Sequence, residues 1–318
     1  MTLVQLEYVL AVAENKNFTI AAEKVFVTQP TLSMQIQKLE RELNIEIFDR
    51  STHPIKITSI GQKIIDQAKV ILNESKRMSH IVTEIRNNLE GKYTVGVIPT
   101  ILPTLIPLFY KNFKTQFPKA DLYIKEMKTE EMTEALAADE IDFGIAVTPL
   151  NQNDIIELPL YYEPMVAYIP PGGRLSEKEK ISESDLDLND LLLLEEGHCF
   201  RNNVLSICKV YNDIEDENPN ALSVDSGNFY TLVKLARDGF GMTILPLLQA
   251  EDLAEEDKLN IKSFQDPVPT REVSIIYHSS QLRLKFVEEL QKLIQSLVRG
   301  IIYLESSQET LPQLKLNK

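Results

Sequence analysis

The two cysteines of the chain, Cys199 and Cys208, lie nine residues apart. Cys199 follows His198, precedes Arg201 by two positions and opens a run of helical character. Nearby cations and a helix N-terminus favour the thiolate, which is the reactive form of cysteine. Cys208 stands beside Ile207 without such neighbours in the sequence. This asymmetry is typical of a redox pair, in which one thiol is oxidised and the other resolves it as a disulfide.

The spacing of the two cysteines also makes a geometric prediction. If residues 200–208 are helical, a rise of ~1.5 Å per residue places the two cysteines roughly 13 Å apart. A disulfide needs Cα atoms closer than ~7 Å, so the segment must refold before the bond can form. The alternative is two ordinary buried cysteines, which are common in protein interiors. The two cysteines by themselves favour that alternative.

Length and composition limit the class of protein. A chain of 318 residues with 43% hydrophobic and 25% charged residues is expected to form two or three globular domains. No apolar run reaches the length of a membrane span, and the N-terminus lacks the basic leader of a signal peptide, so we expect a cytoplasmic protein with no membrane contact. The net charge is −14, but residues 1–60 hold six basic and seven acidic residues, which is nearly neutral. Electrostatic support for nucleic-acid binding is therefore weak, and the evidence for such binding must come from the residue pattern.

Residues 1–58 read as short helices followed by a wing. Apolar residues recur at helical spacing from Leu3, and Thr19 and Thr28 are candidate N-caps. Pro30 suits the first turn of a helix that Asn44 then ends, and residues 51–58 suit a small wing. Two short helices, a tight turn and a second helix with one polar face describe a helix-turn-helix. The alternative is a generic three-helix bundle, which the periodicity alone favours.

The residues themselves resemble a known family. The stretch NFTIAAEKVFVTQPTLSMQIQKLERELNIEIFDR, residues 17–50, closely resembles the DNA-binding head of LysR-type transcriptional regulators. His53 and Met34 depart from the family's more usual residues at those positions. The resemblance implies double-stranded promoter DNA as a partner. It implies a DNA-contacting set made of Gln29, Pro30, Thr31, Ser33, Met34, Gln37, Lys38 and Arg50.

Residues 59–89 show a 4-3 apolar spacing that is typical of a dimerising helix. The expected seam is Ile64, Ala68, Ile71, Ser75, Met78, Val82, Ile85 and Leu89. The alternative is an amphipathic helix packed on its own domain. The regularity of the spacing over eight positions favours dimerisation and matches the linker helix of the family, and the family resemblance favours a homotetramer over a homodimer.

From residue 90 to residue 300 strands alternate with helices, which predicts parallel α/β sheets. This part resembles the two-lobed, periplasmic-binding-protein-like effector domain of the same family. The resemblance implies lobe I at 91–163 with 268–300 and lobe II at 164–267. Residues 301–318 read as a polar C-terminal tail. The expected fold is thus a winged helix-turn-helix with a linker helix, followed by an α/β two-lobed domain.

The cysteine segment narrows the resemblance to the peroxide-sensing OxyR branch of the family. The matching residues are Gly197, His198, Cys199, Arg201 and Cys208. The resemblance implies that Thr100, Thr129 and Arg271 complete a peroxide pocket, in which hydroxyls orient peroxide and donors stabilise the leaving hydroxide. The alternatives are helix caps for the two threonines, a surface charge beside a strand for Arg271 and an exposed loop residue for His198.

We therefore expect a transcription regulator that senses hydrogen peroxide through reversible Cys199–Cys208 disulfide formation, with RNA polymerase as a candidate further partner. The sequence shows no histidine spacing for a metal and no glycine-rich nucleotide motif, so we expect no cofactor. One alternative is a LysR-type regulator that binds a small anion in the inter-lobe cleft, for example at the helix start near Pro99 and Thr100. A thiol peroxidase and a solute-binding protein are further alternatives, and the helix-turn-helix argues against both. We expect no enzymatic activity.

Overall fold

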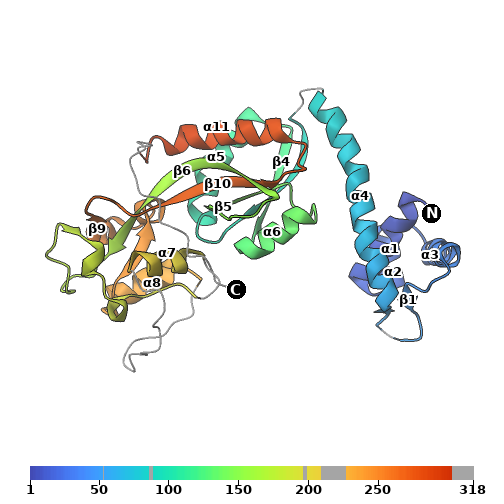
Figure 1. The fold of residues 1–318 in the computed structure, drawn as a ribbon, viewed down its shortest axis with the longest axis horizontal. Coiled ribbons are helices and arrows are strands. Elements are labelled where there is room, and N and C mark those ends of the chain that lie inside the picture. The colour runs from blue at the N-terminus through green and yellow to red at the C-terminus, as the bar shows by residue number, and fades with distance from the viewer. Residues whose placement is uncertain (53, 86–88, 196–198, 209–226, 303–318) are drawn as a thin grey trace. The chain divides into compact units, whose positions relative to one another are not determined.

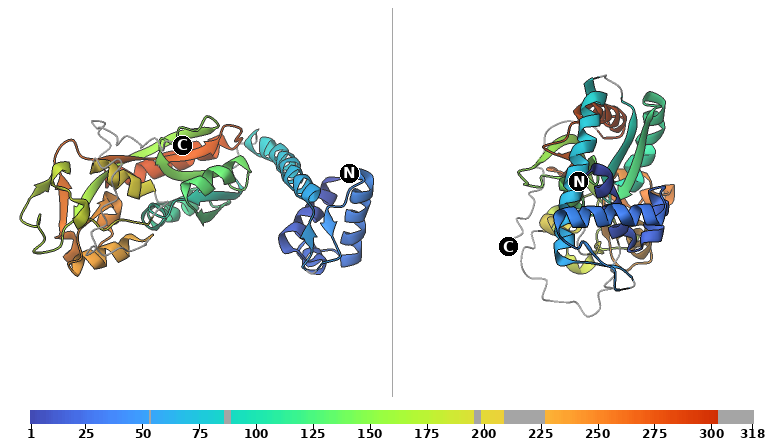
Figure 2. Two further views of the ribbon diagram at one scale, coloured as in Figure 1. Left: turned by 60° about the horizontal axis from the view of Figure 1, so that its bottom comes forward. Right: turned by 90° about the vertical axis from the view of Figure 1, so that its right-hand side faces the viewer.

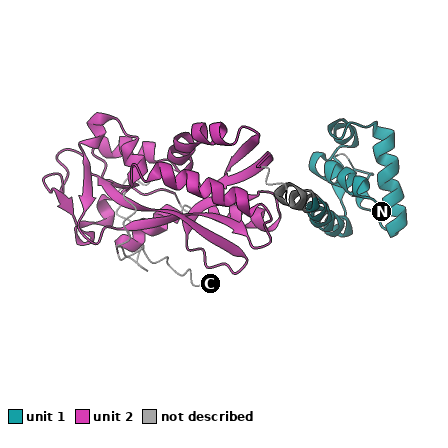
Figure 3. Ribbon diagram, turned by 90° about the horizontal axis from the view of Figure 1, so that it is seen from above, with its two compact units in different colours: residues 1–88 teal, residues 89–318 magenta. Residues whose placement is uncertain are grey.

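The computed structural model describes residues 1–52, 54–85, 89–195, 199–208 and 227–302. It divides into two compact units, Met1–Asn88 and Leu89–Lys318 (Figure 3). Within the described ranges, no helix is both long and apolar enough to cross a bilayer.

The first unit begins with helices α1 (Leu3–Asn15), α2 (Phe18–Lys24) and α3 (Gln29–Leu43). Their apolar faces meet in one core that includes Leu32 and Ile36 of α3. The Thr28 hydroxyl caps α3 by accepting from the Thr31 amide, a proline lies in its first turn, and a left-handed Asn44 ends it, all as predicted. The cap of α2 was predicted wrongly. Asn17 caps it, because its side-chain oxygen accepts two amide hydrogen bonds at the helix start.

The wing follows α3 as predicted. Strand β1 (Phe48–Asp49) pairs antiparallel with β2 (Lys56–Ile57), and helix α4 (Ser59–Ile85) starts directly after it. Gly61 near the start of α4 allows a close approach to the chain before the wing, since a Cβ there would lie 2.2 Å from the Ile47 carbonyl oxygen. The first unit is therefore a winged helix-turn-helix with a long helix attached.

The predicted seam of α4 divides into two parts. Ala68 is buried in the core of its own unit, and Ile64 and Ile71 pack against that core, as the alternative interpretation required. Met78, further along the helix, leaves 70% of its surface exposed. The prediction for Leu89 was wrong, because Leu89 lies outside α4 and packs against a core of the second unit. The side chains of Val82 and Ile85 lie outside the described residues.

The turn between α2 and α3 contains an exposed aromatic residue in the left-handed region. Phe26 has φ 58° and is 94% exposed. A side chain other than glycine or asparagine costs roughly 1–2 kcal/mol in this conformation. We expect Phe26→Asn to stabilise the first unit by about 0.5–1 kcal/mol, measured by hydrogen exchange of the α3 amides. Ile20→Asn, at an exposed position inside α2, serves as the control and should weaken protection. Weaker protection in Phe26→Asn would contradict the prediction.

The second unit contains one mixed sheet of eight strands. The strand order is β4 (Ala120–Glu126), β3 (Gly91–Val97), β5 (Phe143–Thr148), β10 (Thr270–His278), β6 (Ile155–Tyr168), β9 (Ile261–Phe264) and β7 (Lys180–Ile181), and β8 (Thr243–Pro246) pairs with β6. The prediction of parallel sheets holds for β3, β4 and β5. It was wrong for β10, which pairs antiparallel with both β5 and β6, and for β6, which pairs antiparallel with β8 and β9 as well.

Helices cover both faces of the first half of this sheet (Figure 1). They are α5 (Leu102–Gln116), α6 (Thr129–Ala137) and α11 (Leu284–Val298). Side chains alternate between the faces of a strand, and β3 shows this directly. Tyr93 stacks on Phe286 of α11 with centroids 3.6 Å apart, whereas a Cβ at Gly96 would meet Met132 of α6. The first core therefore lies between the sheet and these helices.

A second core surrounds the other half of the sheet. It receives side chains from α7 (Cys199–Ile207), α8 (Phe229–Arg237) and α9 (Leu247–Glu251). This half of the unit also contains α10 (Glu255–Lys258) and two short 3-10 turns at Glu183–Asp185 and Leu188–Asp190. Strands β6 and β10 run side by side toward it from the first core (Figures 1 and 2). The two cores confirm the predicted two-lobed architecture. The predicted strand at 221–224 lies outside the described residues.

Candidate functional site

The two candidate threonines lie at one edge of the sheet. Thr100 follows β3 and Thr129 follows β4, and these strands are parallel neighbours. The carboxyl ends of parallel strands meet at the same sheet edge, where ligands of α/β folds bind. Neither threonine is an N-cap: Ile101 is the N-cap of α5, and Lys128 is that of α6, in which Thr129 is the first residue. The helix-cap interpretation was therefore wrong, and both hydroxyls are directed to other partners.

Arg271 lies within β10 at this same edge and is 2% exposed, so the interpretation as a surface charge was wrong. Its Nη1 donates to Thr100 Oγ1 at 3.2 Å, and its Nη2 donates to the Thr100 carbonyl at 3.3 Å. Its Nε donates to Glu163 Oε2 at 2.8 Å. A buried guanidinium requires such a counter-charge, because desolvation of an unpaired ion is costly.

Cys199 is the first residue of α7 and packs against the first core. The side chain of Thr129 and the backbone amide of Phe200 both hydrogen-bond to its sulfur. The aromatic ring of Phe200 lies under the Arg271 guanidinium, with 5.4 Å from Cζ to the ring centroid. The candidate sulfur thus meets a hydroxyl, a helix N-terminus and a buried cation.

Burial nevertheless dominates the acidity of this thiol. Desolvation raises the pKa of Cys199 above its ordinary value, although the Arg271 charge and the Thr129 hydrogen bond act to lower it. This net direction is opposite to the sequence expectation. The cation that acts on the thiol is Arg271, which is 72 positions away in the sequence, and not Arg201. The Arg201 guanidinium instead donates to the Leu194 carbonyl at 3.0 Å.

Cys208 lies just past the other end of α7 and packs against the second core. Burial raises the pKa of Cys208 to about 11, and the charges of Glu183 and Asp187 add to this. Because α7 is helical from Cys199 to Ile207, the two cysteines are separated by roughly 13 Å. Both thiols are free, and each packs against a different core. Gly197 and His198 lie outside the described residues.

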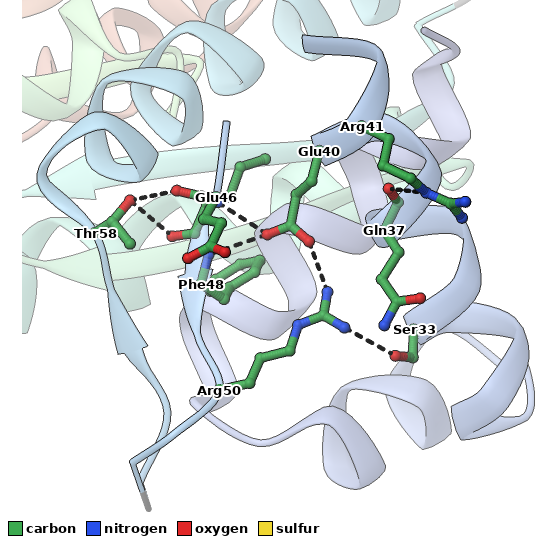
Figure 4. Close-up of polar contacts among 9 residues, drawn as sticks. Ser33, Gln37, Glu40, Arg41, Glu46, Phe48, Arg50 and Thr58 are labelled. Carbon is green, nitrogen blue, oxygen red and sulfur yellow. Dashed lines mark hydrogen bonds and ion pairs between the residues drawn. The ribbon is translucent and has the colours of Figure 1, made fainter. Parts of the chain in front are cut away.

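The candidate DNA-binding residues form a second site on the first unit. Six of the eight are exposed, namely Gln29, Pro30, Thr31, Met34, Gln37 and Lys38. Ser33 and Arg50 are partly buried and contact each other, with 3.4 Å from Arg50 Nη1 to Ser33 Oγ (Figure 4). Arg50 also pairs with Glu40 at 2.7 Å, so one end of its guanidinium is held by the head itself.

Glu40 holds the wing against α3. Its Oε1 accepts from the backbone amides of Ile47 and Phe48 at 2.9 and 3.2 Å, and its Oε2 accepts from Arg50 (Figure 4). Thr58 closes the base of the wing, because its hydroxyl donates to the Glu46 carbonyl at 2.6 Å. The exposed face of α3 is therefore presented on a rigid head.

Family models match both units. The model for the bacterial regulatory helix-turn-helix protein of the lysR family matches residues 3–62, and the model for the LysR substrate binding domain matches residues 86–299. The chain belongs to the LysR family, in its OxyR branch. It is 31% identical over 96% of its length to the hydrogen peroxide-inducible genes activator of Pectobacterium carotovorum, of which 99% is covered.

Two further OxyR proteins support this placement. The DNA-binding transcriptional dual regulator OxyR of Escherichia coli is 31% identical over 94% of this chain and 97% of the relative. A full-length OxyR variant of Pseudomonas aeruginosa has the same fold, with a TM-score of 0.74, 31% identity and coverage of 93% of this chain and 98% of that one. The expected family and fold are thereby confirmed.

Sequence reasoning missed three residues of the two candidate sites. Glu163, Phe200 and Glu40 make the contacts that hold Arg271 and Arg50. A signal was present for Glu163, since a charged residue interrupts the otherwise apolar stretch LPLYYEPMVAYI. Buried charges in strands need partners, and that rule could have pointed to Arg271. Among the described residues, no cluster of His, Cys, Asp or Glu is arranged to hold a metal ion.

Proposed function

We propose that this protein is a transcription regulator that senses hydrogen peroxide through Cys199 and Cys208. One observation supports this most strongly: Cys199 opens α7, where the Thr129 side chain and the Arg271 charge both act to lower its pKa, and Cys208 lies just past the other end of the same helix. The OxyR relatives named above, described as peroxide-inducible activators and DNA-binding regulators, support the same assignment.

The chemistry begins at the Cys199 thiolate. Its sulfur attacks one peroxide oxygen, so an S–O bond forms as the O–O bond breaks, and hydroxide leaves and is protonated to water. In this proposal, Arg271 and the hydroxyls of Thr100 and Thr129 stabilise the departing oxygen. The Cys208 thiolate then attacks the Cys199 sulfur and releases the second hydroxide, which becomes water. Two thiols supply the two electrons that reduce one peroxide to two waters.

Disulfide formation requires that α7 unfold. The separation of roughly 13 Å exceeds the ~7 Å limit for disulfide Cα atoms. The covalent bond therefore fixes a conformation of residues 199–208 that differs from the reduced helix.

Peptide mass mapping under non-reducing conditions tests this proposal. One equivalent of hydrogen peroxide should produce a Cys199–Cys208 disulfide in the full-length protein. The Cys208→Ser variant should stop at a Cys199 sulfenic acid, trapped by a dimedone-type probe, and Cys199→Ser should remain unmodified at Cys208. The proposal fails if wild-type protein keeps both thiols, or if only Cys208 is oxidised.

The second part of the proposal is that the α3 face binds double-stranded promoter DNA in the cytoplasm. We expect Lys38→Gln to weaken DNA binding for all sequences alike and to reduce the salt slope of log Kd by about 1, as loss of one phosphate contact does. Fluorescence anisotropy across a salt series measures this slope. Lys63→Gln, at an exposed position of α4, is the matched control with an unchanged slope. Equal slopes for both variants would contradict the assignment of α3.

We further propose that each segment of the chain has its own function. Residues 1–58 bind DNA, the part of α4 beyond Ile71 dimerises, and residues 90–300 sense peroxide with lobes at 91–163 with 268–300 and at 164–267. Homotetramers and contact with RNA polymerase belong to the same proposal. A small anion as the trigger has less support, because the guanidinium near Thr100 is already neutralised by Glu163.

A further inference from the structure

We propose that Glu163 is a positioning residue for peroxide reduction, which holds Arg271 against Thr100 and thereby sets the reactivity of Cys199. This inference rests on the proposed function, because it concerns the reaction of the same sulfur.

The first support is the geometry of the ion pair. Glu163 and Arg271 face each other across β6 and β10, and Glu163 Oε2 lies 2.8 Å from Arg271 Nε and 2.7 Å from its Nη2. Each side chain is 1% exposed. A carboxylate held on this side of the planar guanidinium leaves Nη1 directed at Thr100 Oγ1, so Glu163 selects the orientation of the donors.

The second support is that the carboxylate is itself held. Its other oxygen, Oε1, accepts from the Leu248 backbone amide at 3.0 Å, at the start of α9. A backbone donor cannot rotate away, so it fixes the carboxylate, which in turn fixes the guanidinium. A chain of contacts thus runs from Leu248 through Glu163 and Arg271 to Thr100.

The third support is the pattern of charges around the sulfur. Arg271 and Glu130 both act on the Cys199 thiol, with opposite effects on its pKa, while Glu163 acts on the guanidinium. A displacement of Arg271 would weaken the effect that lowers the Cys199 pKa while the opposing effect of Glu130 remained, which disfavours the thiolate. Glu163 therefore acts on Cys199 through Arg271.

The experiment is a double-mutant cycle in the full-length Cys208→Ser protein, which isolates the first reaction step. Glu163→Gln removes the charge at nearly constant shape, and Arg271→Gln removes its partner. We expect Glu163→Gln to slow sulfenic acid formation about tenfold, and to change the rate by less than about twofold when Arg271 is already glutamine. The Cys199 pKa, measured by the pH dependence of iodoacetamide alkylation, should rise in Glu163→Gln.

A matched control separates positioning from loss of stability. Asp257→Asn removes another buried carboxylate that is paired with an arginine, Arg237 of α8. It should lower thermal stability as Glu163→Gln does, yet leave the peroxide rate within about twofold of wild type. The double variant Glu163→Gln/Arg271→Gln leaves neither ion unpaired and should be more stable than Arg271→Gln, which keeps the cycle measurable.

The inference is overturned if Glu163→Gln reacts as fast as wild type or faster, or if it slows the reaction equally with and without Arg271. Failure of the proposed function looks different. In that case peroxide leaves wild-type Cys199 unmodified, while the alkylation measurement still reports whether Glu163 acts on Cys199 through Arg271.

Discussion

Replacing Arg271 with glutamine is expected to slow the reaction of Cys199 with hydrogen peroxide by about a hundredfold at neutral pH. Two losses combine in this variant. The Cys199 thiolate loses the cation that lowers its pKa, and the departing hydroxide loses a donor beside Thr100. Stopped-flow kinetics of sulfenic acid formation at fixed pH measures the rate constant.

The same variant should lose about 3–5 kcal/mol of folding stability, because Glu163 stays buried without its counter-ion. Urea denaturation followed by circular dichroism measures this loss. Arg237→Gln removes an arginine from the more exposed ion pair with Asp257 and serves as the control, with a wild-type peroxide rate. A wild-type rate in Arg271→Gln would show that the guanidinium takes no part in the reaction.

The second large effect concerns pH. Burial raises the pKa of Cys199, so at neutral pH most of the thiol is protonated and the reactive thiolate is the minor form. The observed rate should therefore climb about tenfold per pH unit between about pH 6 and 8, with no plateau in that range. Sulfenic acid formation in the Cys208→Ser variant gives this profile without interference from the second thiol.

Thr129→Val gives this profile its internal check. It removes the hydrogen bond that lowers the pKa of Cys199, so the rate should be lower than wild type at every pH in the range while the slope stays the same. A wild-type profile that levels off near pH 6 would mean that the thiolate already predominates there, contrary to the direction derived from burial.

Local patterns allowed much of the fold to be predicted. The Thr28 cap, the left-handed Asn44 and the helix that opens at Cys199 depend on neighbouring residues, and the structure confirmed all three. The cap of α2 was missed because Asn17 and Thr19 are both good capping residues and only the observed backbone shows which side chain accepts.

The chemistry of the site depended on contacts that are distant in the sequence. Arg201 is close to Cys199 in the chain, but its guanidinium donates to the Leu194 carbonyl. The charge that lowers the pKa of Cys199 is that of Arg271, whose position depends on the pairing of β10 with β6. Burial of the sulfur also could not be predicted from the local sequence, because Cys199 packs against a core that other strands and helices form. The antiparallel course of β10 had the same origin, since strand direction follows from tertiary pairing.

Strand β6 pairs with β10 through backbone hydrogen bonds from Ile155 to Pro164, and its continuation pairs with β8 and β9. A two-lobed domain that closes over its ligand needs a flexible hinge between the lobes. Here the connection is a pair of hydrogen-bonded strands, and the buried ion pair of Glu163 and Arg271 joins these strands. Bending of these two strands would break backbone hydrogen bonds between them and separate the ion pair of Glu163 and Arg271. We therefore expect oxidation to change the conformation of α7 alone, while the two lobes keep their relative orientation.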